Sequence, residues 1–127
     1  MSQESVEVVR RAFEYEVFGR GDASASFDPE VVMTPVEEAP RYGLDAIRDN
    51  FMSWEAAWDE LETTAEEFID GGDRVVVTIY FRGRGRRSGI EIDTRLYEVY
   101  FLREGKIVRV QEFTDRAEAF EAAGLSE

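Results

Sequence analysis

The sequence predicts an α+β fold in which a cone-shaped, curved antiparallel β-sheet wraps around N-terminal helices. The second half of the chain reads as four consecutive strands, at Glu62–Ile69, Arg74–Phe81, Gly89–Phe101 and Lys106–Phe113. Two helical segments precede these strands and a short one follows them. The loops that join the last three strands are rich in glycine and arginine, as expected of hairpin turns. Such a cone leaves a pocket between sheet and helices, and any chemistry is expected there.

Both N-terminal helices are amphipathic by pattern. In the first, which follows a cap at Ser2 and stops at Gly19, the regularly spaced apolar residues are Val6, Val9, Phe13 and Val17. In the second, from about Leu44 to Glu60, they are Ile47, Phe51, Trp54, Trp58 and Leu61. Each helix therefore has one apolar face to bury, and the tryptophans lie one turn apart on the second helix.

Shorter signals mark the remaining segments. Asp28 followed by Pro29 predicts a short helical turn, Val31–Met33 a brief extended piece, and residues 36–42 a loop. Near the end of the chain, Asp115 with a glutamate three residues later fits a capping box, which predicts a short C-terminal helix.

The composition excludes several classes of protein. At 127 residues, 43% of them hydrophobic, the chain is predicted to form one domain, residues 1–127. It has neither cysteine nor histidine, which excludes thiol nucleophiles and histidine-dependent triads, so we expect no metal and no cofactor. The net charge of -13 opposes binding to nucleic acid and to anionic lipid. The arginines at 82, 84, 86 and 87 read as a solvated hairpin tip rather than a phosphate site.

The location of the protein is also predicted from pattern. No apolar run approaches the length that crosses a membrane, and the N-terminus lacks a basic segment followed by an apolar one. We therefore expect a cytoplasmic protein without a signal peptide or a membrane anchor.

The order of elements resembles the SnoaL-like branch of the nuclear-transport-factor-two-like superfamily, which also contains ketosteroid isomerases. The segments that carry the resemblance are residues 18–22 (FGRGD), 42–47 (YGLDAI), 69–77 (IDGGDRVVV), 102–109 (LREGKIVR) and 114–120 (TDRAEAF). The resemblance implies the cone fold and a pocket for a small hydrophobic molecule. It also implies a cofactor-independent isomerase or cyclase-like enzyme, and fold alone does not fix the reaction.

Carrying the family's functional positions over gives a partial match. Where ketosteroid isomerases have an aspartate base before a proline, this chain has Thr34 before Pro35, and threonine cannot act as that base. Where they place a protonated aspartate that donates to an oxyanion, it has Tyr97, which can still donate. Their first-helix tyrosine falls on Glu14, with Tyr15 one residue away. SnoaL-like cyclases use a histidine and aspartate pair, and this chain has no histidine.

We predict a pocket built around the strand that carries Tyr97. If Tyr97 faces inward, strand alternation turns Asp93 and Arg95 the same way, and the last strand turns Glu112 inward. Glu112 or Asp93 would be the base, Tyr97 the hydrogen-bond donor and Arg95 the charge anchor. The remaining ligand-binding residues are predicted to be Phe13, Tyr15, Thr34, Trp54 and Trp58.

Each of these residues has a structural alternative. Arg95 and Glu112 would form an internal ion pair that only joins strands. Tyr97 and the tryptophans would be ordinary core residues, and Asp93 would be solvated at the rim of the cone.

Three functions remain open from the sequence. The first is an isomerase, cyclase, dehydratase or hydrolase that acts on a hydrophobic small molecule by carboxylate acid–base chemistry. The second is a non-catalytic small-molecule-binding protein with the same pocket. The third is a homodimeric interaction module. A homodimer is expected under all three, through an exposed sheet face that carries Leu96, Tyr100 and Leu102.

Overall fold

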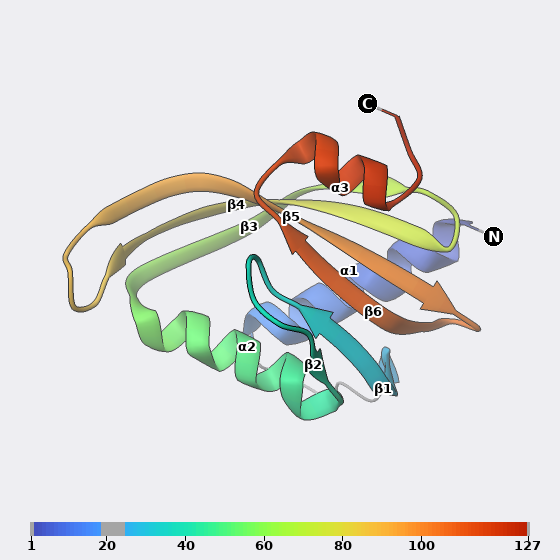
Figure 1. Cartoon of the computed structure of the whole chain (residues 1–127), viewed down its shortest axis with the longest axis horizontal. Helices are drawn as coiled ribbons and strands as arrows, with labels where there is room; N and C mark the ends of the chain where they lie inside the picture. Colours follow the sequence, from blue (N-terminus) through green and yellow to red (C-terminus); the bar gives the residue numbers. More distant parts are fainter. Residues whose placement is uncertain (1, 19–24, 127) are drawn as a thin grey trace.

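The computed structural model describes the backbone of residues 2–18 and 25–126, and the side chains of residues 4–14 and 25–126 (Figure 1). Its elements, in chain order, are α1 (Ser2–Phe18), β1 (Phe27–Thr34), β2 (Arg41–Tyr42), α2 (Leu44–Ala57), β3 (Trp58–Asp70), β4 (Arg74–Gly85), β5 (Glu91–Arg103), β6 (Lys106–Phe113) and α3 (Arg116–Ala122). None of the described helices is long and apolar enough to cross a membrane.

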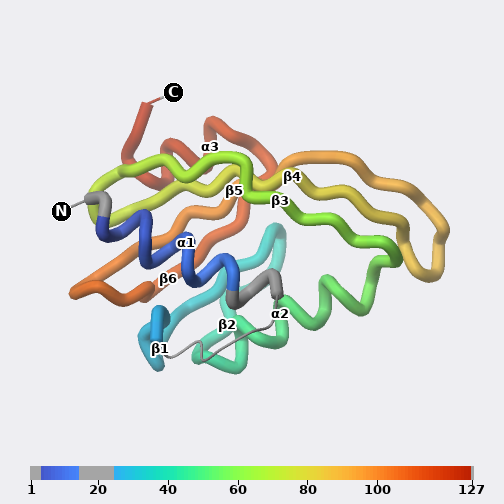
Figure 2. Tube along the Cα trace, turned by 180° about the vertical axis from the view of Figure 1, so that it is seen from behind, coloured from blue at the N-terminus to red at the C-terminus, as the bar shows by residue number. Residues whose placement is uncertain are grey.

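The strands form one curved, unclosed six-stranded sheet in the order β2-β1-β6-β5-β4-β3. Neighbouring strands are antiparallel except for β1 and β6, which pair in parallel. Helices α1 and α2 lie on one side of the sheet and α3 lies on the other (Figures 1 and 2). The predicted α+β architecture is therefore confirmed, and its concave side is the one that the N-terminal helices fill.

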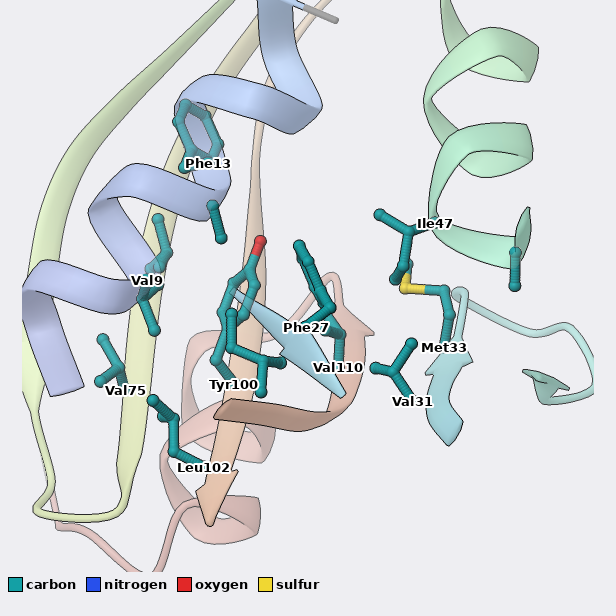
Figure 3. Packing of buried hydrophobic residues seen from close by; sticks show 14 of the residues in the cluster. Val9, Phe13, Phe27, Val31, Met33, Ile47, Val75, Tyr100, Leu102 and Val110 are labelled. Atoms are coloured by element: carbon teal, nitrogen blue, oxygen red, sulfur yellow. The ribbon is translucent and has the colours of Figure 1, made fainter. Parts of the chain in front are cut away.

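The main apolar core lies between the concave face and the first two helices. Figure 3 shows Val9 and Phe13 of α1, Ile47 of α2 and Tyr100 of β5 turned toward this layer. Tyr100, with 0% of its surface exposed, is among the largest side chains buried there. Burial of side chains of this size is the main favourable contribution to folding.

A second, smaller core lies on the convex face under α3. Its buried residues are Val76, Val99, Ala119, Phe120 and Ala123, and the partly buried Tyr97, Phe101 and Phe113 pack against them. The Asp115 side chain accepts a 2.9 Å hydrogen bond from the Ala117 N–H, which begins α3 at the predicted cap. Alternate residues of β5 thus enter two different cores.

Two predicted boundaries are wrong. Helix α2 ends at Ala57 and Trp58 has the extended backbone angles φ -127° and ψ 141°, so Trp58 begins β3 instead of continuing the helix. The predicted helical turn at Asp28 and Pro29 is part of β1, between Phe27 and Val32, which both pair with β6 in parallel. The Asp28 carboxylate accepts a 2.8 Å hydrogen bond from the Glu30 N–H, and the register with β6 shifts in this stretch.

The entry to α2 is fixed by a glycine. Gly43 has a φ of 92°, which side chains other than glycine rarely adopt. Its N–H donates a 2.8 Å hydrogen bond to the Val31 carbonyl oxygen of β1. This contact holds the first turn of α2 against the sheet, with Ala46, Ile47 and Asn50 buried.

Candidate functional site

A cavity of about 440 Å³ lies among residues of α1, α2 and the concave face of the sheet. Its apolar lining residues are Phe13, Phe51, Trp54, Trp58, Leu61, Ile79, Phe81 and Leu96. Its polar lining residues are Asn50, Glu55, Thr63, Arg86, Glu98 and Glu112. Apolar walls with a few converging polar groups are typical of a small-molecule site, and this volume is within the usual range.

One wall of the cavity is aromatic. The indoles of Trp54 and Trp58 are stacked, with ring centroids 6.2 Å apart and planes at 13°. Both rings meet Phe81 edge-on, at centroid distances of 4.9 and 5.2 Å. A Cβ atom at Gly83 would lie 3.5 Å from Trp58, in ordinary van der Waals contact with the indole. The change from helix to strand at Trp58 thus brings both indoles onto β4.

The polar floor of the cavity is a pair of carboxyl groups. Glu98 of β5 lies opposite Glu112 of β6 in the antiparallel register, so both side chains leave the same face. The two carboxyl groups are hydrogen-bonded to each other, and Glu98 is only 3% exposed. A hydrogen bond between two carboxyl groups requires a proton on one of them. The pair therefore holds at least one proton, and the two carboxyl groups are not both negatively charged.

Three further groups surround the pair. The Tyr100 hydroxyl donates a 2.7 Å hydrogen bond to Glu98 Oε1. Figure 3 shows the oxygen of Tyr100 pointing away from Leu102, along the space beside Phe27. On the other carboxyl, Glu112 accepts hydrogen bonds from the Asn50 side chain and from the Val36 N–H. Strand, helix and loop thus all contribute to the orientation of the two acids.

Burial raises the pKa of the Glu112 carboxyl above its ordinary value of 4.5, since an apolar setting disfavours the charged form. The hydrogen bonds from Glu98, Val36 and Asn50 act in the opposite direction, while the negative charge of Glu38 adds to the rise in pKa. A carboxyl with a raised pKa is suited to exchange protons near neutral pH. The pair can therefore act chemically as an acid and as a base.

Several predicted site residues do lie at the cavity. Glu112, Phe13, Trp54 and Trp58 all line it, so their predicted placement agrees with the structure while their roles stay predictions. Thr34 is not among the lining residues: it pairs with Gln111 of β6, and its neighbour Met33 is the buried residue. The side chain of Tyr15 lies outside the described residues.

The predicted placement of Tyr97, Arg95 and Asp93 in the cavity is wrong, because all three leave the convex face. Tyr97 packs in the core under α3. Arg95 Nε lies 2.7 Å from Glu66 Oε1, and Asp93 accepts a 2.8 Å hydrogen bond from the Tyr80 hydroxyl. The alternative of an ion pair between Arg95 and Glu112 is wrong for the same reason.

A one-residue irregularity between β5 and β6 explains the error. The turn has φ of 51° at Glu104 and 78° at Gly105, as in a two-residue hairpin turn. Unbroken pairing from that turn would put Glu112 opposite Tyr97. The register shifts between Phe101 and Leu102, however, so Glu112 lies opposite Glu98. A shift of one residue exchanges the two faces of a strand.

The predicted dimer stripe on β5 faces inward. Tyr100 and Leu102 are buried in the main core and Leu96 lines the cavity, so these residues do not form an exposed face. The expected interface through them is therefore wrong.

The sequence reasoning did not identify Glu98, Tyr100 or Asn50 as site residues. The available signal for Asn50 was a polar residue one turn before Trp54 on a predicted apolar helix face. The comparable signal for Glu98 was an acid between Leu96 and Tyr100 on an otherwise apolar strand face. Among the described residues, no group of three or more acidic side chains is arranged to hold a metal ion.

A curved sheet that holds two helices and a cavity on its concave side defines the ketosteroid isomerase-like, or nuclear-transport-factor-two-like, class of folds. The model of the SnoaL-like domain family matches residues 9–110. The chain therefore belongs to the SnoaL-like family. No curated protein sequence matches it.

Solved structures agree on the fold. A nuclear-transport-factor-two-like protein from Burkholderia thailandensis E264 is 23% identical, with a TM-score of 0.78 over 91% of this chain and 96% of that one. A protein from Jannaschia sp. CCS1, assigned by name to the SnoaL-like polyketide cyclases, is 21% identical, with a TM-score of 0.76 over 99% and 95%. The epoxide hydrolase/cyclase-like enzyme SalBIII, which has a role in pyran ring formation in the polyether salinomycin, is 23% identical, with a TM-score of 0.71 over 90% of this chain and 92% of that one. At these identities the likeness concerns the fold.

Proposed function

We propose that this protein is a cofactor-independent acid–base enzyme that acts on a hydrophobic small molecule bound in the cavity. The observation that carries the proposal is the buried, proton-sharing pair of Glu98 and Glu112 at the end of an aromatic-walled hollow. Isomerisation, cyclisation, dehydration and hydrolysis all need one group to take a proton and another to give one. A pair with a single proton contains both groups side by side.

In this mechanism the pair holds its charge where a substrate can reach it. The hydrogen bond from Glu98 lowers the pKa of Glu112, so Glu98 donates in this bond and carries the shared proton, while the Tyr100 hydroxyl donates to Glu98 Oε1. Glu112 is then the base and Glu98 the acid at the start of the reaction. Asn50 and the Val36 N–H orient Glu112, and the indoles bound the space that the apolar part of the substrate occupies.

The named relatives support the same reaction class. The similarity to SalBIII and to a SnoaL-like polyketide cyclase favours ring-forming or ring-opening chemistry among the options above. Both reactions need a base that removes a proton from the attacking group and an acid that donates a proton to the leaving or newly formed oxygen, so the carboxyl pair suits either reaction.

A general proton-abstraction assay tests the proposal without a known substrate. In the elimination of 5-nitrobenzisoxazole, a base removes the C3 proton, the C–H electrons form the nitrile, and the N–O bond breaks to give a coloured phenolate. We expect turnover above that of acetate, and Glu98→Gln or Glu112→Gln to lower it by at least about 100-fold. Glu66→Gln, which changes an exposed acid on the convex face, is the matched control and should retain the rate.

The outcome also separates the enzyme from a non-catalytic binding protein. Tryptophan fluorescence reports whether the benzisoxazole enters the cavity, since both indoles line it. If the benzisoxazole binds but reacts only at the background rate, in the wild type and in Glu112→Gln alike, a non-catalytic binding function is favoured.

We also propose a homodimer, now through the convex face of β3, β4 and β5 outside the area that α3 covers. That face carries the exposed pairs Tyr80 with Asp93 and Arg95 with Glu66, which are chemically self-complementary about a two-fold axis. Sedimentation should give a dimer whose dissociation constant rises in Arg95→Glu. A cytoplasmic location, to be tested by cell fractionation, remains part of the proposal.

A further inference from the structure

The charges in the cavity lining are unbalanced. Its described charged residues are Glu55, Glu98, Glu112 and Arg86, that is, three acids and one base. Arg86 already has partners: its guanidinium is 3.5 Å from the Asp59 carboxylate, and Nη2 donates to the carbonyl oxygens of Trp58 and Glu55 at 3.2 and 3.4 Å. The guanidinium is thus bound to two backbone carbonyl oxygens and to the Asp59 carboxylate, beside the indole wall. The described lining residues have a net negative charge.

The aromatic wall adds an electron-rich surface to this charge. The stacked Trp54 and Trp58 and the edge-on Phe81 belong to the same cavity lining as the carboxyl pair. Indole has the most favourable ring face for a cation, and the attraction grows when water is excluded. Anionic ligands meet repulsion from the floor of the same cavity, and neutral ones gain only apolar contact.

We propose that the natural ligand of this cavity is an apolar molecule that carries a positively charged nitrogen, such as a tertiary or quaternary amine, and that the indoles and the Glu98–Glu112 pair bind that charge together. The inference rests on the proposed function and names the substrate class of the same site. A volume of about 440 Å³ accommodates such a molecule.

Binding of a cation next to the Glu98–Glu112 pair should be linked to release of a proton from the pair. The groups that face Glu112 are Glu98 of β5, Glu38 of the β1–β2 loop and the uncharged Asn50 of α2, while Tyr100 faces Glu98. Burial and the negative charge of Glu38 favour a protonated Glu112, and a bound cation favours release of a proton from the pair. A permanent cation should therefore bind more tightly as the pH rises and should release up to one proton per molecule bound.

Three bicyclic probes of similar size isolate the effect of charge: N-methylquinolinium, neutral N-methyl-2-quinolone and the anion 1-naphthoate. In titration calorimetry at pH 7 we expect the cation to bind about 10- to 30-fold more tightly than the quinolone. We expect 1-naphthoate to bind most weakly. Repeating the titration in buffers of different ionisation enthalpy measures the released proton.

Matched variants connect the preference to the residues. Glu112→Gln should remove most of the preference for the cation and leave quinolone binding within about twofold, because the amide keeps the shape and loses the charge. Trp54→Leu should also reduce the preference, and Trp54→Phe should restore part of it, which guards against a folding defect. Glu66→Gln on the convex face should change nothing.

The proposal is overturned if the quinolone or the naphthoate binds as tightly as the cation, if none of the three binds, or if the preference survives Glu112→Gln. These outcomes differ from failure of the proposed function, because benzisoxazole elimination uses a neutral substrate. If elimination depends on Glu112 but the cation is not preferred, the proposed enzyme activity stands and the proposed amine ligand is refuted. If cation binding depends on Glu112 but no elimination occurs, the amine ligand stands and the proposed enzyme activity is refuted.

Discussion

The two faces of β5 carry the same kinds of residue in opposite settings. On the concave face, Tyr100 donates to Glu98, which shares a proton with Glu112. On the convex face, Tyr80 donates to Asp93, while Arg95 of β5 binds Glu66. Burial raises the pKa of Glu112, whereas the hydrogen bond from Arg95 lowers the pKa of the exposed Glu66. Solvent access and charge partners, more than residue type, therefore decide whether an acidic side chain can exchange a proton near neutral pH.

Truncating a tyrosine on each side gives the largest expected contrast. Tyr100→Ala should lower the free energy of unfolding by about 3–5 kcal/mol, because it empties a fully buried volume and removes the donor to Glu98. Tyr97→Ala, a partly buried residue under α3, should cost clearly less. Urea unfolding followed by circular dichroism measures both. Equal losses would mean that the concave core is no more tightly packed than the convex one.

Removing only the hydroxyl isolates the hydrogen bond. Tyr100→Phe should destabilise the fold by about 1–3 kcal/mol, since the buried Glu98 loses a donor. It should also move the rising limb of the pH–rate profile for benzisoxazole elimination to higher pH, because a weaker donor disfavours the ionised pair. Tyr80→Phe, its convex counterpart, should leave the unfolding midpoint and the profile unchanged. If Tyr100→Phe leaves the pH–rate profile unchanged, the Tyr100 hydroxyl does not influence proton transfer by the carboxyl pair.

The pH dependence of stability should have opposite signs for the two acids. The pKa of Glu112 is raised in the folded protein, so its favourable contribution is complete below its ordinary value of 4.5 and is lost as pH rises through the folded value. The pKa of Glu66 is lowered, so its contribution is present above 4.5 and is lost as pH falls through the folded value. As the pH rises above 4.5, the thermal unfolding midpoint of Glu112→Gln should therefore fall less than that of the wild type. As the pH falls below 4.5, the midpoint of Glu66→Gln should fall less than that of the wild type.

The smallest effect is expected from the exposed ion pair itself. Arg95→Gln should shift the unfolding midpoint slightly at low salt and not at all at high salt, because exposed pairs are screened. Thermal melts at two ionic strengths measure this difference. A loss that persists at high salt would show that the convex pair supports packing, for instance through the Arg95 side chain over the Tyr80 ring.

Much of the fold could be predicted from the sequence, because apolar periodicity and turn residues are local signals. The apolar stripes place α1 and α2, and the turns at residues 70–73 and 103–106 join the strands as predicted. The end of α2 was not predictable from pattern, because Trp58 continues the helical stripe and only pairing with Gly85 makes it a strand residue. Asp28 and Pro29 likewise take strand conformation between Phe27 and Val32, whose pairing with β6 is not visible in local sequence.

The candidate site was predictable only in part. Apolar walls follow from helix stripes, so Phe13, Trp54 and Trp58 were assigned to the cavity. The polar floor depends on which face of β5 is concave, and both faces are apolar enough to be buried. The register shift opposite Phe101 and Leu102 adds one residue to β6, so it decides which residue of β5 lies opposite Glu112, and it leaves no residue signature such as a glycine. Glu98 was therefore missed and Tyr97 taken in its place.

The extra residue in β6 also bears on how such a protein diversifies. Because β6 advances by two residues, from Ile107 to Arg109, where β5 advances by one, a single-codon deletion there would turn the later residues of β6 to the opposite face of the sheet. Two descendants with the same amino acids at 98 and 112 would then present one carboxyl group or two to their ligands. Alignments of amino acids alone would hide such a difference, whereas the hydrogen-bond phase of the backbone would reveal it.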